Sequence, residues 1–124
     1  MSGLTYDTGA LIAAANDDRR MWLLHRRALQ RGVTPTVPAP VLLEAWRGEA
    51  VMARLLSGTE VEPLDGTSAC AAGILLKRSG GNASVDASVV EGALRRGDAV
   101  VTSDRGHLTR LAAAVGRRLD IVDV

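Results

Sequence analysis

The chain has 124 residues, a length that fits one domain, and 47% of them are hydrophobic, enough to build a core. The formal net charge of +1 excludes a strongly basic or acidic protein that acts through its overall field. The single cysteine, Cys70, excludes an internal disulfide and a cysteine-based zinc site.

The location of the protein is suggested by two further features of the sequence. Its apolar stretches are far shorter than a membrane span. The N-terminus lacks the basic start and the long apolar run of a signal peptide. We therefore expect a cytoplasmic protein without a membrane partner, folded as a single domain over residues 1–124.

Short apolar runs alternate with helical patterns, and turn or cap residues separate them. In the first half we predict a strand over 4–6, a helix over 10–15, a helix capped by Asn16 or Asp17 and running to Arg31, a strand over 34–37, a helix from Pro40 that breaks at Gly48, and a helix over 49–57. In the second half we predict a strand over 61–64, a helix capped by Asp65 and running to Arg78, a helix capped by Ser84 that stops at Gly97, a strand over 99–102, a helix over 106–115 and a strand over 119–124.

This alternation predicts an α/β fold with a four- to five-stranded parallel sheet and helices on both faces. Pro63 favours an edge position for the strand over 61–64, because proline cannot donate to a neighbouring strand. In such sheets, ligand sites form beyond the C-terminal ends of the strands. Asp7 and Asp104 each follow a predicted strand. We therefore expect these two carboxylates to meet, although they lie far apart in the sequence.

Four acidic residues stand out, and each also has an ordinary structural explanation. Asp7 and Asp104 could simply cap helices. Glu44 lies inside an apolar run, where it could be an exposed charge or the partner of Arg47. Asp86 falls in the first turn of a predicted helix, where the helix dipole favours a negative charge.

As a set, the four acids predict a metal site. Carboxylates gathered in one cleft repel one another, and their burial is unfavourable without a cation. Mg²⁺ or Mn²⁺ prefers oxygen ligands and can complete its shell with water and phosphate oxygens. Such an ion can activate water for hydrolysis of a phosphodiester. The set therefore favours a metal-dependent nuclease, with these ligands: Asp7, Glu44, Asp86 and Asp104.

Other polar residues are weaker candidates for chemistry. His25 and His107 have no metal-ligand spacing, so we expect them to be at the surface or half-buried. Ser103 has no evident histidine partner, which argues against a serine nucleophile. A phosphatase-like transferase resembles Asp-x-Asp after the first strand, but here Gly9 takes the second position. Three hydroxyl groups are expected to orient the acids or a metal-bound water: Thr8, Thr102 and Ser103.

Four segments resemble the motifs of PIN-domain ribonucleases of the VapC toxin type, and the match extends over essentially the whole chain. These segments are 6–12, 38–48, 85–87 and 100–104, and each contains one of the four acids in the expected order. The sequence departs from the family at His107, where another acid is often found.

The resemblance implies a PIN-like domain with endoribonuclease activity that depends on Mg²⁺ or Mn²⁺. Asp7, Glu44, Asp86 and Asp104 would then be the catalytic and metal-binding residues. It also implies an RNA substrate such as tRNA or rRNA, a homodimer, and inhibition by a cognate VapB-like antitoxin in a VapBC toxin–antitoxin system. The alternative is a catalytically weak or inactive module of the same fold that binds RNA or protein, which would have no reason to gather four acids.

Overall fold

Strands and helices alternate along residues 3–124, the part of the chain that the computed structural model describes. The strands are β1 (Leu4–Tyr6), β2 (Thr36–Pro38), β3 (Glu60–Glu62), β4 (Ala99–Thr102) and β5 (Ile121–Asp123). The helices are α1 (Thr8–Ala15), α2 (Arg19–Gln30), α3 (Ala39–Ala45), α4 (Ala50–Leu56), α5 (Gly66–Ser79), α6 (Ser84–Arg96) and α7 (Arg105–Ala113). Within the described residues, no helix is both long enough and apolar enough to cross a membrane.

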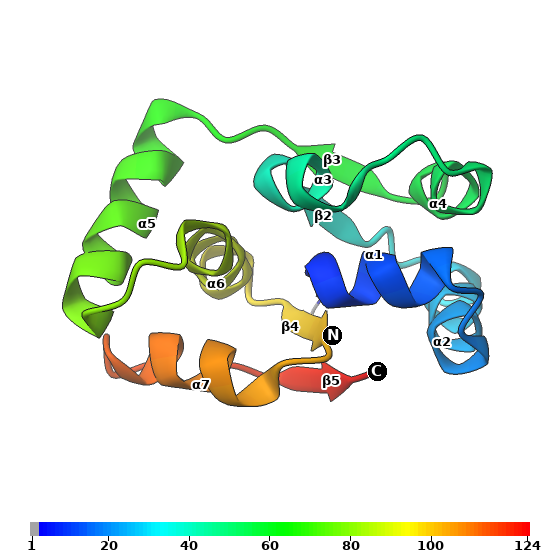
Figure 1. The fold of residues 1–124 in the computed structure, drawn as a ribbon. Helices are drawn as coiled ribbons and strands as arrows, with labels where there is room; N and C mark the ends of the chain where they lie inside the picture. The colour runs from blue at the N-terminus through cyan, green and yellow to red at the C-terminus, as the bar shows by residue number, and fades with distance from the viewer. Residues whose placement is uncertain (1–2) are drawn as a thin grey trace.

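The strands form one parallel sheet in the order β3-β2-β1-β4-β5. Helices α1, α2 and α4 cover one face of the sheet, and α5, α6 and α7 cover the other (Figure 1). The central strand β1 is buried along its whole length, as expected for a parallel strand covered on both faces. The predicted α/β fold, with a parallel sheet between two helical layers, is confirmed, and β3 lies at an edge as Pro63 indicates.

The start of α2 differs from the prediction, because the cap is Asp18 and not Asn16 or Asp17. Asn16 instead ends α1, and Asp17 adopts a left-handed backbone conformation with φ of 58°. That conformation turns the chain, so the second helix can begin only after it. The side chain of Asp18 then accepts a hydrogen bond of 2.9 Å from the N–H of Met21, as a helix cap does.

Several other helix ends also differ from the prediction, and two of them lie close to candidate site residues. Ala83 occupies the cap position of α6, and Ser84 is the first helical residue and makes no capping hydrogen bond. Helix α3 ends before Trp46, whose backbone is extended, and so does not reach Gly48. Neither shift moves Asp86 or Glu44 out of its helix.

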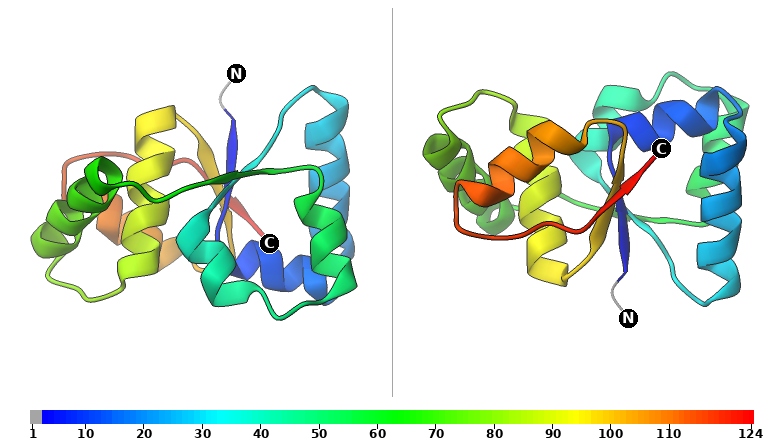
Figure 2. Two further views of the ribbon diagram at one scale, coloured as in Figure 1. Left: turned by 90° about the horizontal axis from the view of Figure 1, so that it is seen from above. Right: turned by 90° about the horizontal axis from the view of Figure 1, so that it is seen from below.

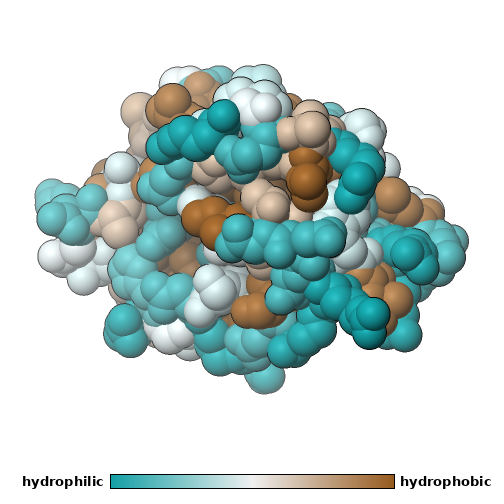
Figure 3. All heavy atoms as spheres, turned by 45° about the vertical axis from the view of Figure 1, so that its right-hand side comes forward, coloured by the Kyte–Doolittle hydropathy of each residue, from teal (hydrophilic) through white to brown (hydrophobic). Residues whose placement is uncertain are grey.

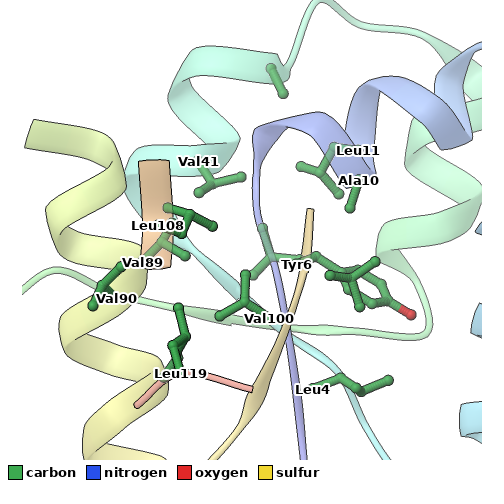
Figure 4. Packing of buried hydrophobic residues seen from close by; sticks show 14 of the residues in the cluster. Leu4, Tyr6, Ala10, Leu11, Val41, Val89, Val90, Val100, Leu108 and Leu119 are labelled. Atoms are coloured by element: carbon green, nitrogen blue, oxygen red, sulfur yellow. The ribbon is translucent and has the colours of Figure 1, made fainter. Parts of the chain in front are cut away.

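The core lies on both sides of the central strands. Figure 4 shows Tyr6 and Val100 on β1 and β4, with Val89 and Val90 contributed by α6. All four side chains are fully buried. The molecular face in Figure 3 is mostly hydrophilic, with small hydrophobic spots. The core thus fixes α6 against the sheet, and α6 carries one of the candidate site residues.

Two polar side chains are paired inside this core, and one of them corrects a prediction. His25 on α2 is only 4% exposed, so the expected surface or half-buried position is wrong for it. Its Nδ1 shares a hydrogen bond of 2.8 Å with the Tyr6 hydroxyl. The Trp22 ring packs nearly perpendicular to the imidazole, and the Arg54 guanidinium lies over the Trp22 ring, 4.7 Å from its centroid. The hydrogen bond gives the Tyr6 hydroxyl and His25 Nδ1 a partner inside the core.

This pair makes the stability of the fold sensitive to acid. Burial lowers the pKa of His25 below its ordinary value of 6.5, so the unfolded chain takes up a proton before the folded chain does. We expect the free energy of unfolding to keep its full His25 contribution above pH 6.5 and to lose it as the pH falls below that value. Urea unfolding at about pH 7.5 and about pH 5.5 measures this loss, within the range where histidine titrates. The loss should be smaller in His25→Gln, and an equal loss in both proteins would contradict the assignment.

Candidate active site

The C-terminal ends of β1 and β4 lie side by side, and each leads to a carboxylate. Tyr6 pairs with Val101, and the N–H of Asp7 donates to the Val101 carbonyl at 3.2 Å. Asp7 caps α1, and Asp104 caps α7. In both views of Figure 2 the first turns of α1, α6 and α7 gather at this end of the sheet. The two strand-end acids are therefore brought to one edge, as predicted.

Asp7 is the most buried of the four acids, with 5% of its surface exposed. Its Oδ1 accepts a hydrogen bond of 3.2 Å from the N–H of Ala10, and its Oδ2 accepts one from the Thr102 hydroxyl. Burial raises the pKa of Asp7, and the nearby charge of Asp86 raises it further, while the bonds from Thr102 and Ala10 act in the opposite direction. The charged form is thus held in a place that disfavours it, which a bound cation would relieve.

The Thr102 hydroxyl joins two of the acids. Its Oγ1 accepts a hydrogen bond of 2.9 Å from the backbone N–H of Asp104. Because the oxygen accepts there, its own proton is directed to Asp7. One side chain at the end of β4 therefore fixes the Asp7 carboxylate relative to the start of α7.

Glu44 is tied to the same end of the sheet by Thr8. The Thr8 hydroxyl donates to Oε1 of Glu44 at 2.6 Å, and Thr8 directly follows Asp7. Glu44 is exposed, and it lines a polar depression of about 270 Å³ together with Asp86. The remaining residues of this depression are Asn82, Ala83, Ser84 and Val85. Glu44 and Asp86 thus face one hollow from two different helices.

Asp86 has a partner that the sequence did not indicate. Nδ1 of His107 lies 2.6 Å from Oδ2 of Asp86, and both side chains are half-buried. The backbone N–H of His107 also donates to Oδ1 of Asp104, at 3.4 Å. The spacing of three residues from the cap predicts that backbone bond. The contact between the imidazole and Asp86 depends on how α6 packs against α7, which no local pattern encodes.

Ser103, the third predicted orienting hydroxyl, packs against Gly9. An added Cβ at Gly9 would overlap the Ser103 hydroxyl and would lie 3.2 Å from the Ser103 backbone nitrogen. The first turn of α1 therefore touches the loop between β4 and α7 directly. Gly9 directly follows Thr8 and Ser103 directly precedes Asp104, so this contact lies close to both strand-end acids.

The four acids are linked through neighbours and do not form a preformed metal shell. Among residues 3–124, no group of three or more His, Cys, Asp or Glu side chains is placed to hold a metal ion by itself. Mg²⁺ usually binds through one or two carboxylates and keeps several waters, which substrate phosphates can replace. An all-oxygen set, with buried Asp7 close to Asp86, fits such an ion. The metal-binding role of the four acids stays a prediction.

Comparison with known proteins gives structural matches only. No protein-family model matches the sequence, and no curated protein matches it. One similar chain belongs to the crystal structure of VapBC2 from Rickettsia felis bound to a DNA fragment from their promoter, with a TM-score of 0.73, 15% identity and 98% of each chain covered. Another belongs to the crystal structure of DNA-bound VapBC from Salmonella typhimurium, with a TM-score of 0.71, 20% identity, and coverage of 99% of this chain and 98% of that one.

These matches bear on the fold. Both extend over nearly the whole length of the two chains compared, so the likeness concerns the complete arrangement of sheet and helices. The chain thus has the fold of chains from VapBC complexes, which confirms at the level of the fold the resemblance that the four sequence motifs indicate.

Proposed function

We propose that this chain is a metal-dependent endoribonuclease that hydrolyses RNA phosphodiester bonds, as the toxin of a VapBC-type toxin–antitoxin system. One observation carries the proposal. Four acids from separate parts of the chain are linked at one end of the sheet by three residues: Thr8, Thr102 and His107. The fold shared with chains of VapBC complexes supports it further.

The proposed chemistry assigns different tasks to the four acids. A bound Mg²⁺ or Mn²⁺ would supply an activated water and neutralise charge that develops on the phosphodiester. Asp7, Asp86 and Asp104 would hold the ion directly or through water, and Glu44 would hold a metal-bound water or a second ion. Thr102 and Thr8 keep the Asp7 and Glu44 carboxylates in fixed orientations. Fixed ligands lower the reorganisation that the reaction requires.

For partners, we propose a VapB-like antitoxin and a homodimer. Both similar chains come from structures described as VapBC complexes, which supports an antitoxin. An apolar groove of about 680 Å³ shares Ser84 and Val85 with the polar depression of the site. Leu43, which also lines the groove, is 81% exposed. Contiguous exposed apolar surface is typical of protein interfaces, so this end of the molecule suits a protein partner.

Removal of the metal provides the first test. The purified chain is incubated with total RNA or with tRNA and rRNA, in Mg²⁺, in Mn²⁺, in EDTA, and in EDTA followed by excess Mg²⁺. We expect discrete cleavage in both metals, a fall to background in EDTA and recovery after the metal is restored, because the ion supplies the activated water. Mapping of the cleaved 5′ and 3′ ends identifies the RNA and the bond.

Asp18→Asn is a matched control for this assay. Asp18 caps α2 as Asp7 caps α1, but it takes no part in the carboxylate site, so its replacement should leave cleavage unchanged. Cleavage that persists in EDTA would contradict the proposal. RNA binding without cleavage in any metal would support the alternative, an inactive binding module of the same fold.

A further inference from the structure

His107 stands between two of the candidate ligands. It occupies the first turn of α7, which Asp104 caps, and its backbone N–H donates to that carboxylate. Its imidazole reaches across to α6, where Nδ1 lies 2.6 Å from Oδ2 of Asp86. The residue therefore links α7 to α6 at the point where each helix contributes an acid.

We propose that His107 is a positioning residue that holds the Asp86 carboxylate in the orientation needed to bind a divalent cation. This role rests on the proposed metal-dependent nuclease site. A carboxylate can only accept at this contact, so the ring must carry its proton on Nδ1. The Nδ1–H therefore donates to Oδ2 of Asp86.

The geometry separates the two oxygens of Asp86. The imidazole occupies Oδ2, and Asp86 also faces the polar depression that Glu44 lines. With one oxygen engaged by the ring, the other is available to the ion or to one of its waters. Such partners of a metal ligand restrict its rotation and strengthen its binding, and their removal typically weakens metal affinity about 10- to 100-fold.

Binding of Mn²⁺ alone tests the proposal without reference to cleavage. Calorimetry and the EPR signal of free Mn²⁺ give the affinity at one fixed pH for the wild type, His107→Leu and His107→Asn. The Asn side chain can place an N–H donor near the position of Nδ1, whereas Leu keeps the bulk and removes the donor. We expect affinity about 10- to 100-fold weaker in His107→Leu and close to wild type in His107→Asn. Thr109→Val, an exposed site on the same helix, is the control and should bind as the wild type does.

The possible outcomes distinguish a wrong role for His107 from a wrong metal site. Equal affinity in the wild type and His107→Leu would overturn the role of His107 and leave the metal site intact. A wild type that binds no Mn²⁺ would overturn the metal site and this role with it. Loss in both His107 variants, or a directly coordinated ¹⁴N in the pulsed EPR spectrum of the wild-type complex, would also overturn it. Loss of affinity in both variants would mean that the N–H donor of the imidazole does not determine metal binding. A coordinated ¹⁴N would mean that His107 is itself a metal ligand.

Discussion

Replacement of Asp7 by Asn is expected to slow RNA cleavage strongly and, in the absence of metal, to make the fold more stable. The loss of cleavage follows if Asp7 is a ligand. A bound metal contributes several kcal/mol to the stabilisation of a phosphoryl transition state. Since about 1.4 kcal/mol corresponds to a tenfold change in rate, we expect a reduction of about 10³-fold. Asp18→Asn should show neither effect, because that cap lies on the exposed start of α2.

The gain in stability follows from the raised pKa of Asp7. Burial is the main cause, and the charge of Asp86 adds to it. The folded chain therefore keeps the proton on Asp7 at a pH where the unfolded chain, with the ordinary value of 3.8, has released it. The Asp7 contribution to the free energy of unfolding is present below pH 3.8 and is lost as the pH rises through the folded pKa. At neutral pH the charged side chain destabilises the fold, and Asn removes that charge.

Melting temperatures in EDTA check this directly. The excess stability of Asp7→Asn over the wild type should grow as the pH rises from about 4 and then level off, since the pKa of Asp7 in the folded chain is raised above its ordinary value. Added Mn²⁺ should raise the melting temperature of the wild type by mass action and leave that of the variant unchanged. A variant that is less stable than the wild type at neutral pH would contradict the expected destabilisation of the fold by the buried charge of Asp7.

The sequence predicts the strand-end acids well because their positions follow from local rules. A buried strand followed by a cap residue is visible in one short window, and the parallel arrangement then places Asp7 and Asp104 at the same edge. The edge position of β3 was predicted from a different local feature, Pro63, which directly follows the strand and cannot donate to a neighbouring one. Cap identity was less predictable at Asp18, because the left-handed backbone of Asp17 depends on how α1 turns into α2.

Contacts between helices lie outside what the sequence pattern contains. The imidazole of His25 on α2 is buried against Tyr6 on β1, and His107 meets Asp86 because α7 packs beside α6. The partner of each histidine is determined by the packing of distant segments. The spacing of residues along the sequence therefore does not predict either contact. The packing places the two histidines in different settings: His25 lies in the core beside Tyr6, and His107 contacts the candidate ligand Asp86.

Gly9 provides the second large effect that we expect, and it tests the spacing of the site without changing any acid. In Gly9→Ala the new Cβ overlaps the Ser103 hydroxyl and stands 3.2 Å from both the Cβ and the backbone nitrogen of Ser103. The hydroxyl lies on a short side chain whose Cβ and backbone nitrogen are also close, so α1 must move away from the loop that carries Asp104 to relieve the overlap. A displacement of about 1 Å in a catalytic arrangement can reduce the rate about 10²-fold, and we expect a loss of that order.

Gly66→Ala is the matched control, because Gly66 also lies in a first helical turn close behind a capping aspartate. An added Cβ there meets nothing within 4 Å, so cleavage should be unchanged. The double variant Gly9→Ala/Ser103→Gly removes the Oγ and Cβ of residue 103. Only the 3.2 Å approach of the new Cβ to the backbone nitrogen of residue 103 then remains. The double variant should recover most of the lost rate, since the helix then needs to shift by only a few tenths of an ångström. If Gly9→Ala alone cleaves RNA as fast as the wild type, the separation of Asp7 and Asp104 is not what limits the reaction.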